Sequence, residues 1–297
     1  MKGDPVMTNT VPAPLANLNG EIMPLVEAKV PVLDRGFLFG DAVYEVLRVY
    51  GGRAWLEEPH FQRFDHSLKA IRIQGIDLGR LRRRMHETIA AGPFREATVY
   101  IEVTRGAAMR SHPFPSDATP LELLFVQQFI DPYVEGREKG CGVVLQADIR
   151  WGRCDIKSTN LLANVLAIQA AKEAGCAEAL LCRPDGTVTE GTHSSLFGVI
   201  DGVLRTSPKT NAILPGVTRD LIVEMAKTAG IRIEERSLNR NELSRASELF
   251  LTGTTSEVLP IATVDGQLVS DGRPGKVVRR LQELYGSAVQ EFRARAV

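Results

Sequence analysis

The sequence has no excess of either charge, and this excludes an overall attraction to polyanions. Thirty-six lysine and arginine residues balance 36 aspartate and glutamate residues in a chain of 297, so nothing draws the whole molecule to nucleic acid or to an anionic membrane surface. The basic run at 80–87 carries leucine and methionine at helical spacing and is interpreted as a solvated helix face. No apolar run is long enough to cross a bilayer. We therefore expect neither a nucleic-acid partner nor a membrane partner.

Cysteine is also scarce. The separations between the four cysteines fit neither a disulfide framework nor a close-paired metal knuckle, and the residues are Cys141, Cys154, Cys176 and Cys182. We expect reduced, mainly structural thiols and no metal site. The first twenty residues contain no apolar core of signal-peptide length. Together these absences predict a cytoplasmic protein.

The apolar content, by contrast, is sufficient for a large core, at 44% of the residues. Strand-like and helix-like periods alternate with hairpin turns, for example at Gly51-Gly52. This mixture predicts an α+β fold with helices packed on sheets, and not a doubly wound parallel sheet. A polar segment with proline and glycine makes the best domain boundary. We therefore expect an N-terminal α+β domain, a linker and a C-terminal α+β domain over residues 1–130, 131–139 and 140–297.

A long irregular loop is predicted in the first half of the chain. It covers residues 107–120, between strands expected at 98–106 and 121–129, and is rich in proline, serine and charge. Long loops inside compact domains are usually functional or disordered. This loop is therefore a candidate part of a site.

Lys157 stands between a predicted strand over 141–149 and a predicted helix over 160–175. The next three residues, Ser158 to Asn160, are all good N-cap residues, so we expect the helix to begin immediately after the lysine. A helix N-terminus and partial burial would both favour the neutral amine, which is the form that acts as a nucleophile. The alternative reading is a solvated loop lysine.

Several separated segments, in this order along essentially the whole chain, resemble the class IV aminotransferases, the fold-type IV family of pyridoxal-phosphate enzymes. Within that family the chain is most similar to the D-amino-acid transaminases. The resemblance implies a two-domain fold in which each domain is a mixed sheet or barrel with packed helices, and a cofactor in the interdomain cleft. The segments that carry it are 34–52, 60–64, 103–115, 148–162, 187–199, 213–220 and 249–258.

The resemblance assigns the cofactor's reactive contacts to two residues. Lys157 would hold pyridoxal 5′-phosphate as a Schiff base and later carry the proton of the substrate Cα atom. Glu190 would keep the pyridine nitrogen protonated, so that the ring can accept electrons from the developing carbanion. The alternative for Glu190 is a surface glutamate at the end of a strand.

The resemblance also implies a phosphate site. Gly216 precedes a predicted helix whose first amide groups are unpaired, and such an end binds phosphate on physical grounds alone. Gly253 stands where the family commonly has serine, which removes one hydroxyl. Arg63 could otherwise be an exposed helix residue, and Thr254 an ordinary strand residue. The family's phosphate donors correspond here to Arg63, Val217, Thr218 and Thr254.

Three residues are expected to contact the substrate. Tyr44 matches a family tyrosine near substrate and cofactor, although its surroundings would also fit a half-buried strand aromatic. Arg110 and His112, in the long loop, match the pair with which D-amino-acid transaminases hold the substrate carboxylate. In those relatives the loop crosses a dimer interface, so a homodimer is implied. The alternative is two solvated loop residues.

The resemblance leaves three functions open. The expected one is transamination of D-amino acids, of the D-alanine and D-glutamate type, with 2-oxo acids. The second is another reaction on the same scaffold, either that of aminodeoxychorismate lyase or transamination of branched-chain L-amino acids. The third, non-catalytic binding of the cofactor, is disfavoured by Lys157 and Glu190. The pair Arg110 and His112 favours the first, because fold likeness alone cannot separate these chemistries.

Overall fold

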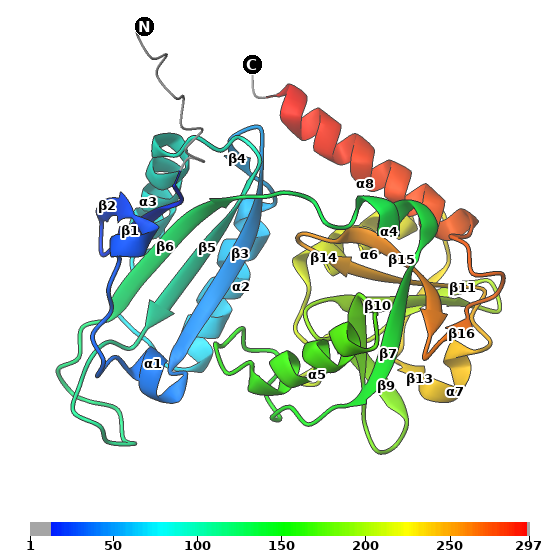
Figure 1. Ribbon diagram of the computed structural model, residues 1–297, viewed down its shortest axis with the longest axis horizontal. Coiled ribbons are helices and arrows are strands. Elements are labelled where there is room, and N and C mark those ends of the chain that lie inside the picture. Colours follow the sequence, from blue (N-terminus) through cyan, green and yellow to red (C-terminus); the bar gives the residue numbers. More distant parts are fainter. Residues whose placement is uncertain (1–12, 296–297) are drawn as a thin grey trace, which may run out of the picture.

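The protein contains two β-sheets that lie side by side, each with its own helices (Figure 1). This arrangement is seen in a computed structural model that describes residues 13–295. Residues 1–12 and 296–297 lie outside the described residues. The first of these ranges includes the start of the expected first domain and most of the segment in which no signal peptide was expected. No helix in the described range 13–295 combines the length and apolarity needed to cross a membrane.

The first sheet has the strand order β2-β1-β6-β5-β3-β4, and each neighbouring pair is antiparallel. A short 3₁₀ helix η1 (Leu25–Glu27) and helix α1 (Arg35–Phe39) connect β2 to β3. Helix α1 begins after Asp34, whose side chain accepts a hydrogen bond from the amide of Gly36. The strands are β1 (Leu15–Leu18), β2 (Glu21–Pro24), β3 (Ala42–Tyr50), β4 (Arg53–Ala54), β5 (Ala97–Thr104) and β6 (Leu121–Gln128).

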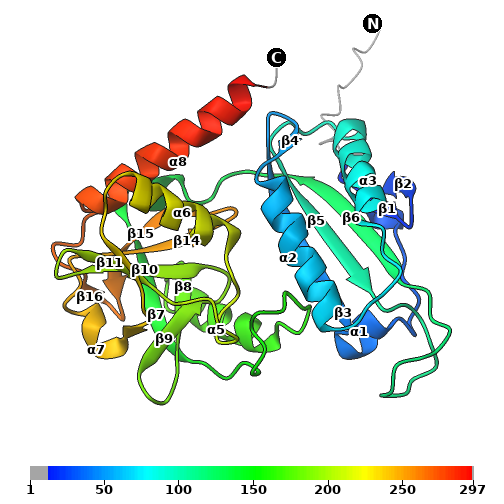
Figure 2. The ribbon, with the colours of Figure 1, turned by 180° about the vertical axis from the view of Figure 1, so that it is seen from behind.

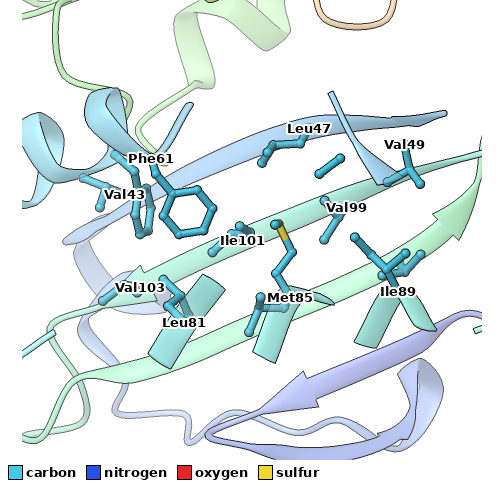
Figure 3. Close-up of a cluster of buried hydrophobic side chains, with 14 of the residues drawn as sticks. Val43, Leu47, Val49, Phe61, Leu81, Met85, Ile89, Val99, Ile101 and Val103 are labelled. Carbon is cyan, nitrogen blue, oxygen red and sulfur yellow. The ribbon is translucent and has the colours of Figure 1, made fainter. Parts of the chain in front are cut away.

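Two helices, α2 (Glu57–Ala70) and α3 (Leu78–Ala91), cover one face of this sheet (Figure 2). In β3, alternate residues such as Val43 and Leu47 point toward the helices, as the period of a strand requires. Figure 3 shows them in one cluster with side chains of both helices, including Met85. Each large apolar side chain buried here stabilises the fold by about 1.5–3 kcal/mol. The first sheet and its two helices therefore form a rigid support for the residues at the ends of the strands.

The second sheet has ten strands in the order β12-β11-β10-β14-β15-β7-β8-β9-β13, with β16 beside β15. Three pairs are parallel, namely β11 with β12, β15 with β7 and β7 with β8, and the others are antiparallel. The sheet curls, since β9 and β10 also contact each other. The strands are β7 (Cys141–Ala147), β8 (Glu178–Cys182), β9 (Thr187–Gly191), β10 (Ser195–Ile200), β11 (Val203–Thr206), β12 (Ile233–Glu235), β13 (Leu238–Asn239), β14 (Glu248–Gly253), β15 (Glu257–Val264) and β16 (Gln267–Leu268).

The helices of the second half pack on different parts of this sheet. Helix α5 (Leu162–Glu173) packs against β7 and β8, whereas α6 (Val217–Thr228) and α8 (Lys276–Ala294) pack together and against β14. Helix α7 (Arg240–Leu243) follows β13, and α4 (Val134–Lys139) lies within the segment expected to be a linker and packs on β15.

Helix α8 also joins the two halves, because it runs from the second sheet toward β4 (Figure 1). The indole nitrogen of Trp55, just after β4, donates to the hydroxyl of Tyr285 in α8 over 3.1 Å. On the same side, the hydroxyl of Tyr50 in β3 donates to Glu257 in β15 over 2.7 Å. These contacts fix the distance between the two sheets.

Candidate active site

A cavity of about 440 Å³ is lined by residues of both sheets. Tyr44 in β3 and Arg63 in α2 come from the first half, and the other lining residues come from segments spread between residues 149 and 254. The cavity therefore brings together parts of the chain that are far apart in sequence. The predicted site residues that line it are Tyr44, Arg63, Lys157, Glu190, Val217, Thr218 and Thr254.

Lys157 is attached to the first sheet, although it belongs to a loop after β7. Its amide donates to Ser67 Oγ in α2 over 3.1 Å, and its carbonyl accepts from the Tyr44 amide over 3.0 Å. The Thr159 amide donates to the Ala42 carbonyl over 3.2 Å, so the loop extends the pairing of β3. The half-buried side chain places Nζ 4.3 Å from the centroid of the Tyr44 ring.

The helix that follows Lys157 begins later than predicted. Helix α5 starts at Leu162, and its N-cap Leu161 makes no side-chain cap. Ser158 forms a β-bridge with Val43, so its backbone is committed to strand pairing and cannot start a helix. The expectation of a helix N-terminus next to the lysine was therefore wrong.

Glu190, at the end of β9, is buried beside an arginine that the sequence analysis had not singled out. The guanidinium of Arg150 donates to Glu190 and, through two other nitrogens, to Asp148 at 2.9 Å each. The Leu214 amide also donates to Glu190, over 3.1 Å. Burial raises the pKa of Glu190 to about 7, and Arg150 opposes that rise. The carboxyl group is thus poised to accept or share a proton inside the cavity.

Arg63 belongs to a buried cluster beneath the cavity. Its Nε and Nη2 atoms donate to Glu45 over 2.7 and 2.9 Å, and Nη1 donates to the Pro215 carbonyl over 3.0 Å. His60 Nδ1 lies 2.7 Å from the same carboxylate. Burial alone would raise the pKa of Glu45, but the charges of Arg63 and His60 hold it below its usual range. Glu45 therefore fixes the direction of the Arg63 guanidinium.

The segment beside Arg63 is suited to a phosphate group. Helix α6 begins after Gly216 without a side-chain cap, so its first amides are available to an anion. The hydroxyl of Thr252, which also lines the cavity, is buried without a hydrogen-bond partner. A Cβ atom at Gly253 would lie 2.7 Å from Ser256 Oγ, so a serine at 253 would displace that hydroxyl. Unpaired donors and a guanidinium at one end of a cavity fit a phosphorylated cofactor.

Arg110 and His112 do not line this cavity within their own chain. Both are exposed, and they lie beside Phe39, with 5.6 Å between the Phe39 and His112 ring centroids. The buried guanidinium of Arg35 donates to the carbonyls of Ser111 and His112, over 2.5 and 3.2 Å. The loop is therefore held in place, but it presents the pair away from Lys157 of the same chain.

Two residues that sequence reasoning missed, Glu45 and Arg150, differ in whether the sequence could have indicated them. Glu45 occupies an inward position of β3 between Val43 and Leu47, and a charge in the apolar phase of a strand is such a signal. Arg150 stands in a segment that had been noted, but its charge partner Glu190 is 40 positions away. No pattern in the sequence could have indicated their pairing.

Comparisons with known proteins agree with this geometry. Residues 42–264 match the family model described as Amino-transferase class IV. The D-alanine aminotransferase of Bacillus licheniformis is 37% identical over 283 residues, which cover 94% of this chain and 98% of that protein. The D-alanine aminotransferase of Staphylococcus aureus strain COL is 38% identical over 278 residues, which cover 92% of this chain and 97% of that protein.

Solved structures with the same fold include two branched-chain amino acid aminotransferases. The enzyme from Escherichia coli has a TM-score of 0.86 and 28% sequence identity, and the match covers 93% of this chain and 94% of that chain. The T.th. enzyme, solved with pyridoxamine 5′-phosphate, has a TM-score of 0.85 and 28% identity, and the match covers 94% of this chain and 95% of that chain.

Proposed function

Because this chain belongs to the class IV aminotransferases, it is a pyridoxal-phosphate-dependent transaminase, and we propose that it transfers the amino group of D-amino acids to 2-oxo acids. Donors of the D-alanine and D-glutamate type are the proposed substrates. The support is the 37% identity to the D-alanine aminotransferase of Bacillus licheniformis over nearly the whole chain, against 28% to the branched-chain enzymes.

The residues of the cavity fit the cofactor's three polar ends. Lys157 would hold it covalently through Nζ, and Glu190 would face the pyridine nitrogen. Arg63, Val217, Thr218 and Thr254 would bind the phosphate, with the unpaired Thr252 hydroxyl beside them. When bound, pyridoxal 5′-phosphate supplies an electron sink for the bond that is broken at Cα.

Proton transfer in the reaction is assigned to Lys157. Its Nζ atom would remove the proton from the Cα atom of the amino donor and, in the second half of the reaction, would deliver a proton to the Cα atom of the 2-oxo acid. Tyr44 packs against this amine at 4.3 Å and limits the positions that it can adopt. Glu190 would hold a proton at the pyridine nitrogen, and its burial would strengthen that interaction. These roles divide the chemistry between one mobile amine and one fixed carboxyl group.

The proposed preference for D-amino acids depends on where the substrate carboxylate is held. Lys157 reaches Cα from one face, so the position of the carboxylate decides which hydrogen is removed. The observation that carries this proposal is the loop of Arg110 and His112, which Arg35 fixes at the surface outside its own cavity. We propose that the loop supplies this pair to the cavity of a second copy, in a homodimer.

We also propose that the protein is cytoplasmic. All four cysteines lie in the described part of the chain and are unpaired there, which suits a reducing compartment. The neutral overall charge is compatible with a protein that acts on small molecules.

One coupled assay tests the function against its alternatives. The purified enzyme is given D-alanine, L-leucine or aminodeoxychorismate, each with and without 2-oxoglutarate. Turnover of D-alanine only when 2-oxoglutarate is present supports the proposal. Turnover of L-leucine in its place would identify a branched-chain enzyme, and turnover of aminodeoxychorismate without an acceptor would identify a lyase.

A further inference from the structure

His193 lines the same cavity, on the turn between β9 and β10, and has no role in the reaction described above. The turn is organised by Glu178, a buried carboxylate in β8. Glu178 accepts hydrogen bonds from the amide and hydroxyl of Thr192 and from the hydroxyl of Ser194. The turn is therefore fixed from below by one carboxylate.

The same carboxylate orients the imidazole ring. His193 Nδ1 lies 3.1 Å from Glu178 Oε2 and 3.0 Å from the hydroxyl oxygen of Thr192, which itself donates to Glu178. His193 is the only basic side chain within ion-pair distance of Glu178 in the described part of the chain. The Glu178 side chain is 2% exposed, whereas that of His193 is 48% exposed. With Nδ1 directed at the buried carboxylate, Nε2 is the nitrogen left for a ligand in the cavity.

The arginines of the cavity are all paired with carboxylates, and Arg63 is also assigned to the cofactor phosphate. Arg63 is bound by Glu45, Arg150 by Asp148 and Glu190, and Arg219 by Asp220 and Glu235. Lys157 is the reacting amine. Among the described residues that line the cavity, His193 is therefore the half-exposed basic group whose Nε2 atom makes no hydrogen bond, whereas the unpaired Nε atom of Arg219 is buried.

We propose that His193 is a specificity-determining residue which binds the distal carboxylate of dicarboxylic substrates, such as D-glutamate and 2-oxoglutarate. The proposal rests on the function proposed above, because it concerns the side chain of that reaction's substrate. With Nδ1 beside the Glu178 carboxylate, the ring donates to a ligand through Nε2. Donation from Nε2 to a carboxylate is then a charge-assisted hydrogen bond.

The cofactor phosphate is the competing ligand for this nitrogen, and exposure argues against it. Among the phosphate donors, the Arg63 side chain is 8% exposed, Thr218 is 4% exposed and Thr254 is half-buried. His193 is about half exposed, as suits a group that meets molecules which enter and leave. A contact with substrate rather than cofactor follows from this difference.

The test uses His193→Asn in the loaded enzyme. The asparagine amide can still donate to Glu178, but it does not reach the position of Nε2. We expect kcat/KM for D-glutamate to fall about 10- to 50-fold, mainly through KM, while that for D-alanine changes less than about twofold. His193→Gln, whose amide nitrogen comes near the position of Nε2, should recover part of the loss. His66→Asn, at an exposed histidine paired with Asp155 outside the cavity, is the matched control and should change neither substrate.

Binding is measured separately from turnover. Glutarate should inhibit His193→Asn less strongly than the parent enzyme, and butyrate should inhibit both equally, because only glutarate has a second carboxylate. Equal losses for D-glutamate and D-alanine, weaker retention of the cofactor, or unchanged kinetics with D-glutamate would each overturn the proposal.

The L-enantiomers distinguish this inference from the proposed function. If only L-amino acids react, and His193→Asn selectively lowers activity with L-glutamate relative to L-alanine, the distal-carboxylate site stands and D-specificity fails. If D-amino acids react and the glutamate-to-alanine ratio is unchanged in the variant, D-specificity stands and the role of His193 fails.

Discussion

The Nζ atom of Lys157 lies 4.3 Å from the centroid of the Tyr44 ring, and the Tyr44 amide donates to the Lys157 carbonyl over 3.0 Å. The second contact extends β3, so Lys157 is anchored to this strand. The side chains on the opposite face of β3 pack in the core of the first sheet. Tyr44 is itself stacked on Tyr100, with 5.5 Å between ring centroids. The amine is thus positioned before any ligand arrives, which favours catalysis.

Reduction with borohydride should fix the cofactor on Lys157. The purified protein should be yellow, and the reduced protein should lose that absorbance and carry one modified lysine. Peptide mapping identifies the position. Lys29, outside the cavity, provides the internal control. Modification of any lysine other than Lys157 would refute the assignment.

Glu190→Gln should keep the cofactor but slow removal of the Cα proton by orders of magnitude. The neutral amide no longer stabilises a protonated ring nitrogen, so the developing negative charge is not drawn away from Cα. Single-turnover absorbance with D-alanine measures the proton step, and a cofactor titration measures retention. Unchanged turnover would mean that another group faces the nitrogen.

The cofactor-free protein should lose stability as the pH rises through the range in which Glu190 ionises. Burial raises the pKa of Glu190 to about 7 in the folded protein, so the unfolded chain releases this proton first and stability falls from about pH 4.5 to about pH 7. Glu190→Gln removes this loss. The free energy of unfolding of Glu190→Gln minus that of the parent should therefore increase by about 2–3 kcal/mol from about pH 5 to pH 8.

Urea unfolding of the two proteins at both pH values measures this difference. Glu87→Gln, at an exposed position of α3, is the matched control and should show no such trend. A difference that stays constant with pH would contradict the raised pKa.

Arg63→Ala should weaken cofactor retention by about one to two decades, because a charge-assisted contact is worth about 1.5–3 kcal/mol. It should also destabilise the cofactor-free protein by about 3 kcal/mol or more, since Glu45 would stay buried without its main partner. The double variant Glu45→Gln/Arg63→Ala should regain part of the stability but none of the affinity. Thermal unfolding and cofactor titration follow the two effects. Normal affinity in Arg63→Ala would remove this residue from the phosphate site.

Arg110→Ala should reduce kcat/KM for D-alanine by about 10- to 100-fold, because it removes a bidentate contact to the carboxylate. Mixed dimers of an Arg110→Ala chain and a Lys157→Ala chain should regain activity, since one site then receives an intact lysine and an intact clamp. Mixing each variant with itself is the control. A lack of recovery despite proven subunit exchange would place the clamp within its own chain.

Local patterns in the sequence were sufficient for most of the secondary structure. The hairpin at Gly51-Gly52 has two glycines with positive φ in its turn, and the helix after Gly216 has apolar residues at helical spacing. The short strands β1 and β2 were not expected, because four residues each carry too little periodicity. The late start of α5 was missed for another reason, since pairing with β3 outweighed three favourable N-cap residues.

The residues of the candidate site also fall into two groups, those that a local pattern indicated and those that only the fold revealed. Lys157 and Glu190 could be proposed because each lies in a segment with a family pattern around it. The roles of Arg150, Glu45 and Glu178 depend on partners that the fold brings together across 16 to 40 positions. Such pairs leave no local signal, and they decide the direction and charge of the side chains that the patterns identify.

The place of β15 in the second sheet has a consequence during synthesis of the protein. This strand lies between β14 and β7, so β7 has no neighbour on that side until residues 257–264 have been made. The turn with Thr254 just precedes β15, whereas Tyr44 is near the start of the chain. The second sheet is therefore incomplete until residue 264 of the 297 has been made, whereas the first sheet, to which Lys157 is attached, is complete at residue 128. Contacts between such distant residues form slowly. A cavity lined by both Tyr44 and Thr254 is complete only when nearly the whole chain has been made, so we expect the cofactor to bind after the second sheet has formed.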